Sequence, residues 1–495
     1  MSPQLNGQAK EWNLILEKET KVYYTDKVME TDSFYYVCGR SGNYNYGFSV
    51  TKVNKRNGTP VASVHYEELD INLDFNHSTE WYIDGDKILF PMKTLFPLPA
   101  YINLFSVDMH TLEIEKIAAI PVPDERSKHT MFLFDFKKIG EDYYILSDCY
   151  IKLDADDYEY YPMLIRYSPI TKEYKAILLG DGNDKYGLHK MIGMNGHIYV
   201  FASEPNKNYI GEAKQVIYYL NPDGEQIRKH ITPRVSPIYD VCDVYPLNDR
   251  EVLLASRDIR FSYADHYSWP RWTVTRYDLE ANKEIWSTYW DESRKQSTWH
   301  FARVVPTKMA GEYLLMANDE VITNTEDYST GKVVRFTDEG KRIWQKTYYY
   351  NNSKWGLINE FDSMVPTSDG NYLIVGWVNW GGGFPWLVKI DDDGNIVPVD
   401  TTTSVQDIHA EPGQGATVEI YPNPATDVLH IHIAGAEHRA GYQAIVTGAD
   451  GRVVSEYEIT GQSAIVDVSG YVPGIYTVQV RQQGKMVYVT KFVKM

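Results

Sequence analysis

The sequence has few cysteines and no long hydrophobic run. Its 495 residues include three cysteines, Cys38, Cys149 and Cys242, which lie far apart in the chain. An odd number of widely spaced cysteines does not indicate a disulfide framework, so we expect buried, small hydrophobic side chains. A membrane-spanning helix needs about 18 or more consecutive apolar residues, and the chain has no such stretch.

Positive charge is also scarce. The chain has 49 Lys and Arg against 67 Asp and Glu, a formal net charge of −18. An acidic surface repels nucleic-acid phosphates and anionic membranes, so we expect no nucleic acid among its partners. The N-terminal residues MSPQLNGQAKEW lack the apolar core of a signal peptide.

Short apolar runs with β-branched and aromatic residues recur along the first 400 residues. They are separated by roughly 50–60 residues, enough for four strands and their loops. Long amphipathic helical patterns are missing, which favours an all-β protein. The runs lie at residues 34–39, 87–90, 143–147, 198–202, 252–256, 313–317 and 372–376.

This repeat predicts an all-β fold in which residues 1–400 form a seven-bladed β-propeller. The last unit lacks a fourth strand, and residues 11–17 resemble the fourth strands of other units. We therefore expect residues 11–17 to close the last blade, which removes two open sheet edges. The second unit, residues 70–120, matches least well, so six blades plus an irregular unit is the alternative.

Catalytic motifs are scarce on the predicted propeller. The sequence contains no phosphate-binding glycine loop, HExxH, GxSxG or CxxC motif. One position at the start of each unit is nevertheless often polar, and equivalent positions of a propeller surround its axis. The residues at or near this position are His77, His129, His189, Asp240, His300 and Glu360.

These side chains could bind a divalent metal or an acidic sugar in the channel, with His189, Asp240, His300 and Glu360 as candidate metal ligands. A water-filled channel that binds nothing is the alternative. Exposed aromatic side chains in loops can stack on sugars or fill peptide pockets. Trp269, Trp299 and Trp380 stand nearest to loops and are the first candidates for such contacts.

The last 78 residues change in character. A polar linker is expected over residues 401–417, and short alternating strands follow to the end of the chain. Four motifs occur there in order: YPNPATD, DGRVV, VPGIYTV and the terminal KFVK. Their marked residues are Tyr421, Pro422, Asn423, Pro424, Asp427, Asp450, Gly451, Arg452, Pro473, Gly474, Tyr476 and Lys491.

Residues 418–495 are similar to the type IX secretion system C-terminal sorting domain, type A. The resemblance implies a small immunoglobulin-like β-sandwich that is recognised by the secretion machinery and its sortase. It also implies export across the outer membrane of a Gram-negative bacterium and often attachment to the cell surface. A signal peptide must then be missing from this sequence.

Three functions follow as hypotheses. The propeller could bind a glycan, peptide or host ligand outside the cell. It could instead be a polysaccharide lyase or hydrolase with a metal site in the channel, or a structural component of the surface layer. The sequence favours binding over catalysis, because no catalytic motif was found.

Overall fold

The computed structural model contains β-strands throughout its described part and no helix there. No helical segment in that part therefore has the length and hydrophobicity of a membrane crossing. The chain divides into two compact units, Met1–Val399 and Asp400–Met495. The structure describes residues 11–16, 22–41, 47–67, 73–74, 80–94, 101–121, 130–152, 158–180, 187–205, 213–236, 239–262, 267–290, 302–322, 327–350, 359–378, 384–399, 417–421, 423–434, 441–448, 452–459, 461, 463–482 and 485–495.

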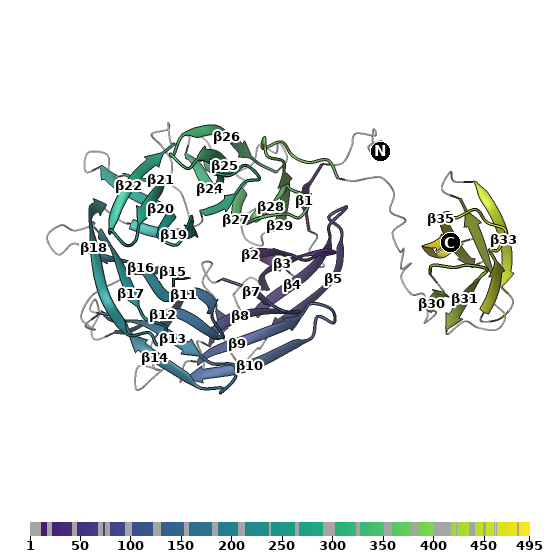
Figure 1. Cartoon of the computed structure of the whole chain (residues 1–495), viewed down its shortest axis with the longest axis horizontal. Coiled ribbons are helices and arrows are strands. Elements are labelled where there is room, and N and C mark those ends of the chain that lie inside the picture. Colours follow the sequence, from purple (N-terminus) through teal and green to yellow (C-terminus); the bar gives the residue numbers. More distant parts are fainter. Residues whose placement is uncertain are drawn as a thin grey trace. The chain divides into compact units, whose positions relative to one another are not determined.

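The first unit is a ring of antiparallel sheets, and seven sheets are present among its described residues (Figure 1). Each sheet is one blade of the predicted propeller. Blade one is β2 (Val22–Glu30), β3 (Phe34–Ser41), β4 (Gly47–Asn54) and β5 (Pro60–Glu67). Blade two is β6 (Leu73–Asp74), β7 (Tyr82–Asp84), β8 (Lys87–Thr94), β9 (Tyr101–Asp108) and β10 (Ile114–Pro121). Its innermost strand is split into β6 and β7, which explains why this unit matched the repeat least well.

The next four blades have the regular order of four strands. Blade three is β11 (Thr130–Ile139), β12 (Asp142–Lys152), β13 (Tyr158–Tyr167) and β14 (Tyr174–Leu178). Blade four is β15 (Gly187–Met194), β16 (His197–Pro205), β17 (Ala213–Leu220) and β18 (Gln226–Ser236). Blade five is β19 (Tyr239–Pro246), β20 (Glu251–Ser262), β21 (Tyr267–Asp278) and β22 (Lys283–Tyr289). Blade six is β23 (Arg303–Pro306), β24 (Glu312–Ile322), β25 (Asp327–Thr337) and β26 (Arg342–Tyr348).

Blade seven combines both ends of the unit. Its strands are β27 (Asn359–Pro366), β28 (Tyr372–Val378), β29 (Phe384–Ile390) and the N-terminal β1 (Asn13–Ile15). β1 pairs antiparallel with β29, with Leu14 opposite Leu387. Trp12, beside this strand, is 2% exposed, so the N-terminal segment is packed into the core. A blade made from both ends of the unit closes the ring, because pairing with β29 holds the N-terminal strand in the last blade.

The middle strands of each blade carry the apolar runs because both of their faces are covered. β28, for example, is buried at almost every position, whereas the outer strand β22 is largely exposed. Side chains of neighbouring blades interlock between the sheets. Between blades one and two, Phe48 packs edge-on against Phe90 with ring centroids 4.5 Å apart. Aromatic packing of this kind explains the high aromatic content of the chain.

A contact that we call the rim clamp joins the outer strands of successive blades. Arg276 of β21 and Trp286 of β22 both donate to the carbonyl oxygen of Asp338 in the next blade, at 3.1 and 2.9 Å. Glu251 of β20 holds the Arg276 guanidinium at 2.6 Å. Blade six repeats this arrangement, with its members Glu312, Arg335 and Trp344 and the carbonyl of Asp392 in blade seven.

The second unit is a β-sandwich of two antiparallel sheets. One sheet has the order β30 (Thr417–Tyr421), β31 (Val428–Ala434), β34 (Ser463–Asp467). The other has the order β33 (Val453–Ile459), β32 (Tyr442–Thr447), β35 (Gly474–Gln482), β36 (Lys485–Lys494). Alternate residues of both sheets, such as Leu429, Ile431, Val446 and Val478, are buried in one core.

Candidate functional site

The innermost strands of the propeller carry charged side chains at one shared position. In strand register this position pairs with the fifth residue of the following strand, as Lys27 does with Cys38 and Asp135 with Leu146, and in blade seven with the fourth, Val375. Glu80 stands two residues before Tyr82, the first residue of β7. We call the residues at this position the axial ring: Lys27, Glu80, Asp135, Lys190, Asp243, Arg303 and Ser363.

Glu80 is the centre of the axial ring. Its carboxylate contacts Lys27 of blade one and Arg303 of blade six, and it lies 3.3 Å from Nζ of Lys190 in blade four. Blades that are not neighbours can meet in this way only near the axis. Lys190 also lies 3.7 Å from Asp135, and Arg303 lies 3.4 Å from Asp243. Each charged member of the ring therefore has an oppositely charged partner.

Burial makes these charges interact strongly. Although burial alone would raise it, the pKa of Glu80 is held well below its usual value by Arg303 and Lys27. Burial and the positive charge of Arg303 lower the pKa of Lys27 to about 8, against the opposing effect of Glu80. The three cations thus share one central anion, and Glu80 stays ionised at neutral pH.

The ring also connects blades through the main chain. Asp135 accepts a hydrogen bond at 2.9 Å from the backbone N–H of Met191 in the next blade. Asp243 does the same for Val304, at 2.8 Å. Among the side chains that the structure describes, no group of three or more His, Cys, Asp or Glu residues could hold a metal ion. These observations give the described axis the character of an ion-paired core.

The residues predicted to bind metal or ligand are only partly covered by the structure. His189 lies in β15, where its Nε2 is 3.0 Å from Oγ of Ser203 in the same blade. Glu360 is 8% exposed in β27. Asp240 and Trp269 lie in β19 and β21, but their side chains are outside the described part. His77, His129, His300, Trp299 and Trp380 lie outside the described residues altogether, so the channel site stays a prediction.

Strand register refines how the predicted residues correspond to one another. His189 directly precedes Lys190 of the axial ring and occupies a β-bulge, since pairing skips from Leu188 to Lys190. Glu360 instead stands three residues before its ring member, Ser363. Comparable bulges occur at Asp26, Phe134, Cys242 and Asp362. In each of these blades the bulged residue directly precedes the ring member, so the bulge keeps the blades in register, and His189 and Glu360 stand at different positions.

The axial ring was missed by sequence reasoning although a signal for it exists. In the first four units a charged residue stands seven residues before the start of the second strand, and in units five and six it stands eight and nine residues before it. The signal was hidden because the position carries Lys or Arg in some blades and Asp or Glu in others. A search for one residue type per position does not find a set of residues that is defined by charge pairing.

In the second unit, separate sequence motifs meet in space. The Asn423 side chain donates to the carbonyl oxygen of Lys491 at 3.1 Å and accepts from the N–H of Val493 at 2.9 Å. The YPNPATD segment therefore binds the terminal strand β36 through the Asn423 side chain and through the main chain of Ala425. Tyr476 stacks on Phe492, with ring centroids 5.5 Å apart, and donates to the carbonyl of Val472 at 2.7 Å.

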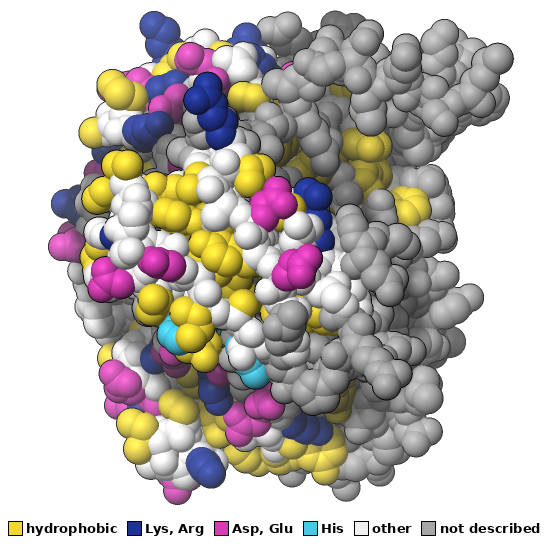
Figure 2. Space-filling model, turned by 90° about the vertical axis from the view of Figure 1, so that its right-hand side faces the viewer, with side chains coloured by type: hydrophobic (Ala, Val, Ile, Leu, Met, Phe, Trp, Pro, Cys, Tyr) yellow, Lys and Arg dark blue, Asp and Glu magenta, His cyan; other side chains and the backbone are white. Residues whose placement is uncertain are grey.

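The remaining motif residues lie mostly at the surface. Tyr421 is 51% exposed and stacks on His430. Pro424, Asp427, Arg452, Pro473 and Gly474 are exposed, whereas Pro422, Asp450 and Gly451 lie outside the described residues. On the face shown in Figure 2, acidic, basic and hydrophobic side chains are interspersed.

Comparison with protein-family models assigns this unit. Residues 419–495 match the secretion system C-terminal sorting domain. The C-terminal unit is a type IX sorting domain. The sorting domain directs export to the cell surface and implies an interaction with the type IX secretion machinery. The predicted resemblance of the last 78 residues is thereby confirmed.

Comparison with curated proteins found no match. Among solved structures, a puromycin-hydrolysing peptidase from Mycobacterium tuberculosis aligns with 7% identity over 86% of this chain and 61% of its own, with a TM-score of 0.47. A Bombyx mori GH32 β-fructofuranosidase aligns with 11% identity, covering 84% of this chain and 85% of its own, at a TM-score of 0.31. A Synechocystis apocarotenoid oxygenase aligns with 11% identity over 64% of this chain and 70% of its own, with a TM-score of 0.38. These scores are too low to support an argument about activity.

Proposed function

We propose that this protein is a binding protein displayed on the outer surface of a Gram-negative bacterium, where its propeller recognises an extracellular glycan, peptide or host ligand. The observation that carries the proposal is the sorting domain at residues 419–495, which marks the propeller as exported cargo. The charged groups of the axial ring neutralise one another, which argues against a metal ion or a charged substrate held at that ring.

The proposal is tested by locating the protein in cells with and without residues 418–495. The full chain should be cleaved by protease added to intact cells, whereas the truncated chain should accumulate in the periplasm. Asn423→Ala should reduce display, because it removes the side chain that binds β36. Glu458→Gln, an exposed change outside the four motifs, is the matched control. Normal display of the truncated chain would refute the proposal.

The channel residues predicted from the sequence can be tested separately. Thermal unfolding is measured with EDTA and then with calcium, manganese or zinc, beside the double variant His189→Ala/His300→Ala. A metal-dependent shift that disappears in the variant would favour the alternative of a metal-dependent polysaccharide lyase or hydrolase. The binding proposal expects no such shift.

A further inference from the structure

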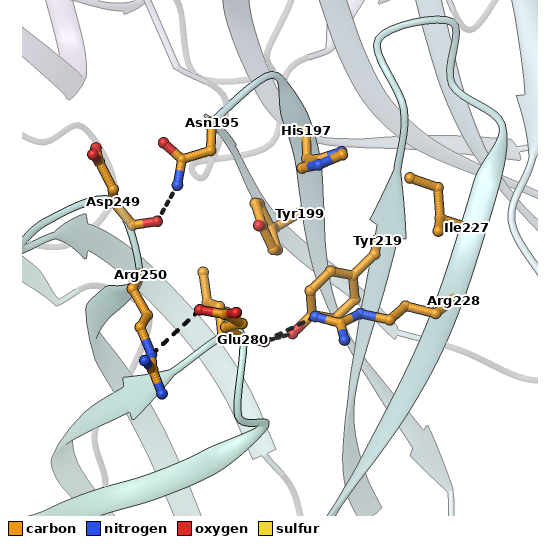
Figure 3. Close-up of a pocket in the computed structure, with 10 residues that line it drawn as sticks. Asn195, His197, Tyr199, Tyr219, Ile227, Arg228, Asp249, Arg250 and Glu280 are labelled. Carbon is orange, nitrogen blue, oxygen red and sulfur yellow. Dashed lines mark hydrogen bonds and ion pairs between the residues drawn. The ribbon is translucent and has the colours of Figure 1, made fainter.

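A cavity of about 400 Å³ lies between blades four and five, at the place where the rim clamp of the following blades has different residues (Figure 3). In blades five and six, the first residue of the second strand is Glu251 or Glu312. The same place in blade four is held by His197. The third strand carries Tyr219 in place of Arg276 or Arg335, and the outer strand carries Arg228 in place of Trp286 or Trp344.

The residues that take the place of the rim clamp in blade four still join blades four and five. Tyr219 Oη and Arg228 Nη2 both donate to the carbonyl oxygen of Leu279 in blade five, the latter at 3.2 Å. The Arg228 guanidinium lies 3.7 Å from the centre of the Tyr219 ring. Aromatic ring and cation have thus exchanged strands. The interface keeps its two donors on one carbonyl, and a cavity lies beside them.

The lining of the cavity is balanced in charge and mixed in polarity. Blade four contributes His197, Tyr199 and Arg228, and blade five contributes Asp249, Arg250 and Glu280. Two arginines and two acidic residues thus line the cavity. Arg250 is paired with Asp278 at 2.7 Å and lies 3.6 Å from Glu280, whose side chain is 77% exposed. A site whose fixed charges cancel does not select a charged ligand.

Unused hydrogen-bonding capacity remains in the lining. His197 lines the cavity, but its Nδ1 is enclosed, so the capacity open to a ligand lies in the charged side chains. The Glu280 carboxylate can accept further bonds, and the Arg250 guanidinium can donate them. Tyr199 and the exposed Ile227 add apolar surface. Sugar hydroxyl groups donate and accept at once and sit on an apolar ring, which suits this combination.

We propose that the cavity between blades four and five binds a neutral carbohydrate of one or two pyranose rings. The volume is at the lower end of the roughly 300–1,000 Å³ found for small-molecule sites. The inference deepens the proposed function and rests on it, because a sugar site is useful on a protein displayed outside the cell. The failure of the sugar site can be distinguished from the failure of the proposed function, because surface display is measured on cells and sugar binding on purified protein.

The test is saturation-transfer NMR and calorimetry on the purified full chain, with maltose, cellobiose and N-acetylglucosamine as neutral probes and glucuronate as a charged comparator. Arg228→Trp restores the residue used in blades five and six and fills the cavity, so it should abolish binding. Lys175→Trp makes the same change at the equivalent position of blade three, since Lys175 pairs with Arg166 as Arg228 pairs with Tyr219. This control should bind normally.

Glu280→Gln provides a second variant that does not threaten folding, because Glu280 is on an exposed turn. It should weaken binding of the neutral probes several-fold. Binding that is unchanged in both Arg228→Trp and Glu280→Gln would place the sugar elsewhere and overturn the inference. Binding of glucuronate alone, or of none of the probes by the wild-type chain, would overturn it as well.

Discussion

The axis and the rim of the propeller hold the same blades together in different ways. At the axis, Glu80 reaches residues of three other blades, so every contact depends on the others. At the rim, each clamp joins one blade to the next and to no further blade. Trp286 and Arg276, for example, both donate to the carbonyl oxygen of Asp338 in blade six.

This difference determines where the propeller can vary. A change of Glu80 removes a shared partner from charged side chains of three other blades at once, which is costly. A change at the rim affects one interface, provided that two donors still reach the carbonyl of the next blade. The interface between blades four and five meets that condition with Tyr219 and Arg228. The rim is therefore the part of the described propeller in which a new site can arise without loss of the fold.

The largest effect is expected for Glu80→Gln at the axis. Lys190 and Arg303 would lose their shared partner, and breaking a buried ion pair costs about 3–5 kcal/mol of unfolding free energy. Urea denaturation measures the loss. The control is Glu115→Gln, which breaks the exposed pair with Lys87 and should cost at most about 1 kcal/mol. Equal effects of the two variants would contradict a special role for the axis.

At the rim we expect an intermediate loss of unfolding free energy. The loss should differ between the rim clamp of blade five and the contact that takes its place in blade four. Trp286→Ala removes a half-buried indole and its hydrogen bond, at a cost of about 3 kcal/mol. Arg228→Ala removes one hydrogen bond and the contact with the Tyr219 ring, at a cost of about 1–2 kcal/mol. Thermal unfolding of both variants side by side tests whether Trp286→Ala destabilises the protein more. A larger loss of stability for Arg228→Ala would contradict this prediction.

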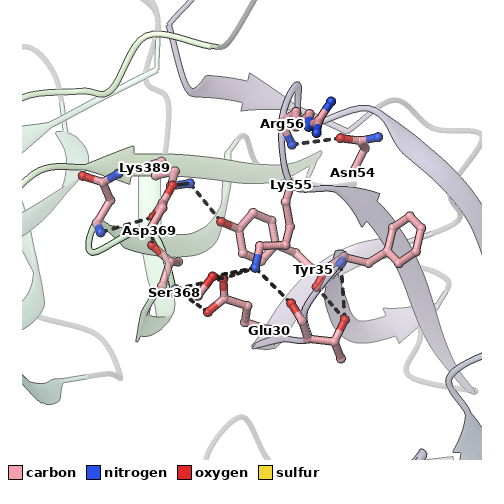
Figure 4. Close-up of polar contacts among 12 residues, drawn as sticks. Glu30, Tyr35, Asn54, Lys55, Arg56, Ser368, Asp369 and Lys389 are labelled. Carbon is pink, nitrogen blue, oxygen red and sulfur yellow. Dashed lines mark hydrogen bonds and ion pairs between the residues drawn. The ribbon is translucent and has the colours of Figure 1, made fainter. Parts of the chain in front are cut away.

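The smallest effect is expected on stability at low pH, and it concerns the contact between blades seven and one that Figure 4 shows. Lys389 Nζ lies 2.5 Å from Asp369 and donates to Tyr35 Oη at 2.9 Å. Although burial opposes it, hydrogen bonding to Lys389 lowers the pKa of Asp369 to about 2. A carboxyl group with a lowered folded-state pKa stabilises the protein above its unfolded pKa and loses this effect as the pH falls towards 2.

Asp369→Asn should therefore reduce the acid sensitivity of the melting temperature between pH 4 and pH 2, as measured by calorimetry. Asp369 is about half exposed, so the effect should stay at or below about 1 kcal/mol. Asp393→Asn, on an exposed turn, is the control and should leave the pH profile unchanged. An identical profile for wild type and Asp369→Asn would exclude a contribution of this ion pair.

The apolar runs made the architecture predictable, since each run became a central strand that is covered on both faces. The all-β fold of a propeller followed by a C-terminal β domain is confirmed. Residues 11–17 could be matched to the fourth strands of other units because they share the sequence pattern of those strands. In the structure, Leu14 of this segment lies opposite Leu387. The sorting domain was equally predictable from the sequence, because each of its four motifs is a continuous run of residues and all four are present.

The sequence by itself thus determined the strand repeat, the sorting motifs and the acidic charge, because each of these is a local property of the chain. The tertiary structure alone decided which charges neutralise one another. Lys27, Glu80, Lys190 and Arg303 are separated by as many as 276 positions, yet ring closure brings them together at the axis. It also decided that Tyr219 and Arg228 share the carbonyl of Leu279, since a contact between blades depends on strand register and on the packing of neighbouring sheets.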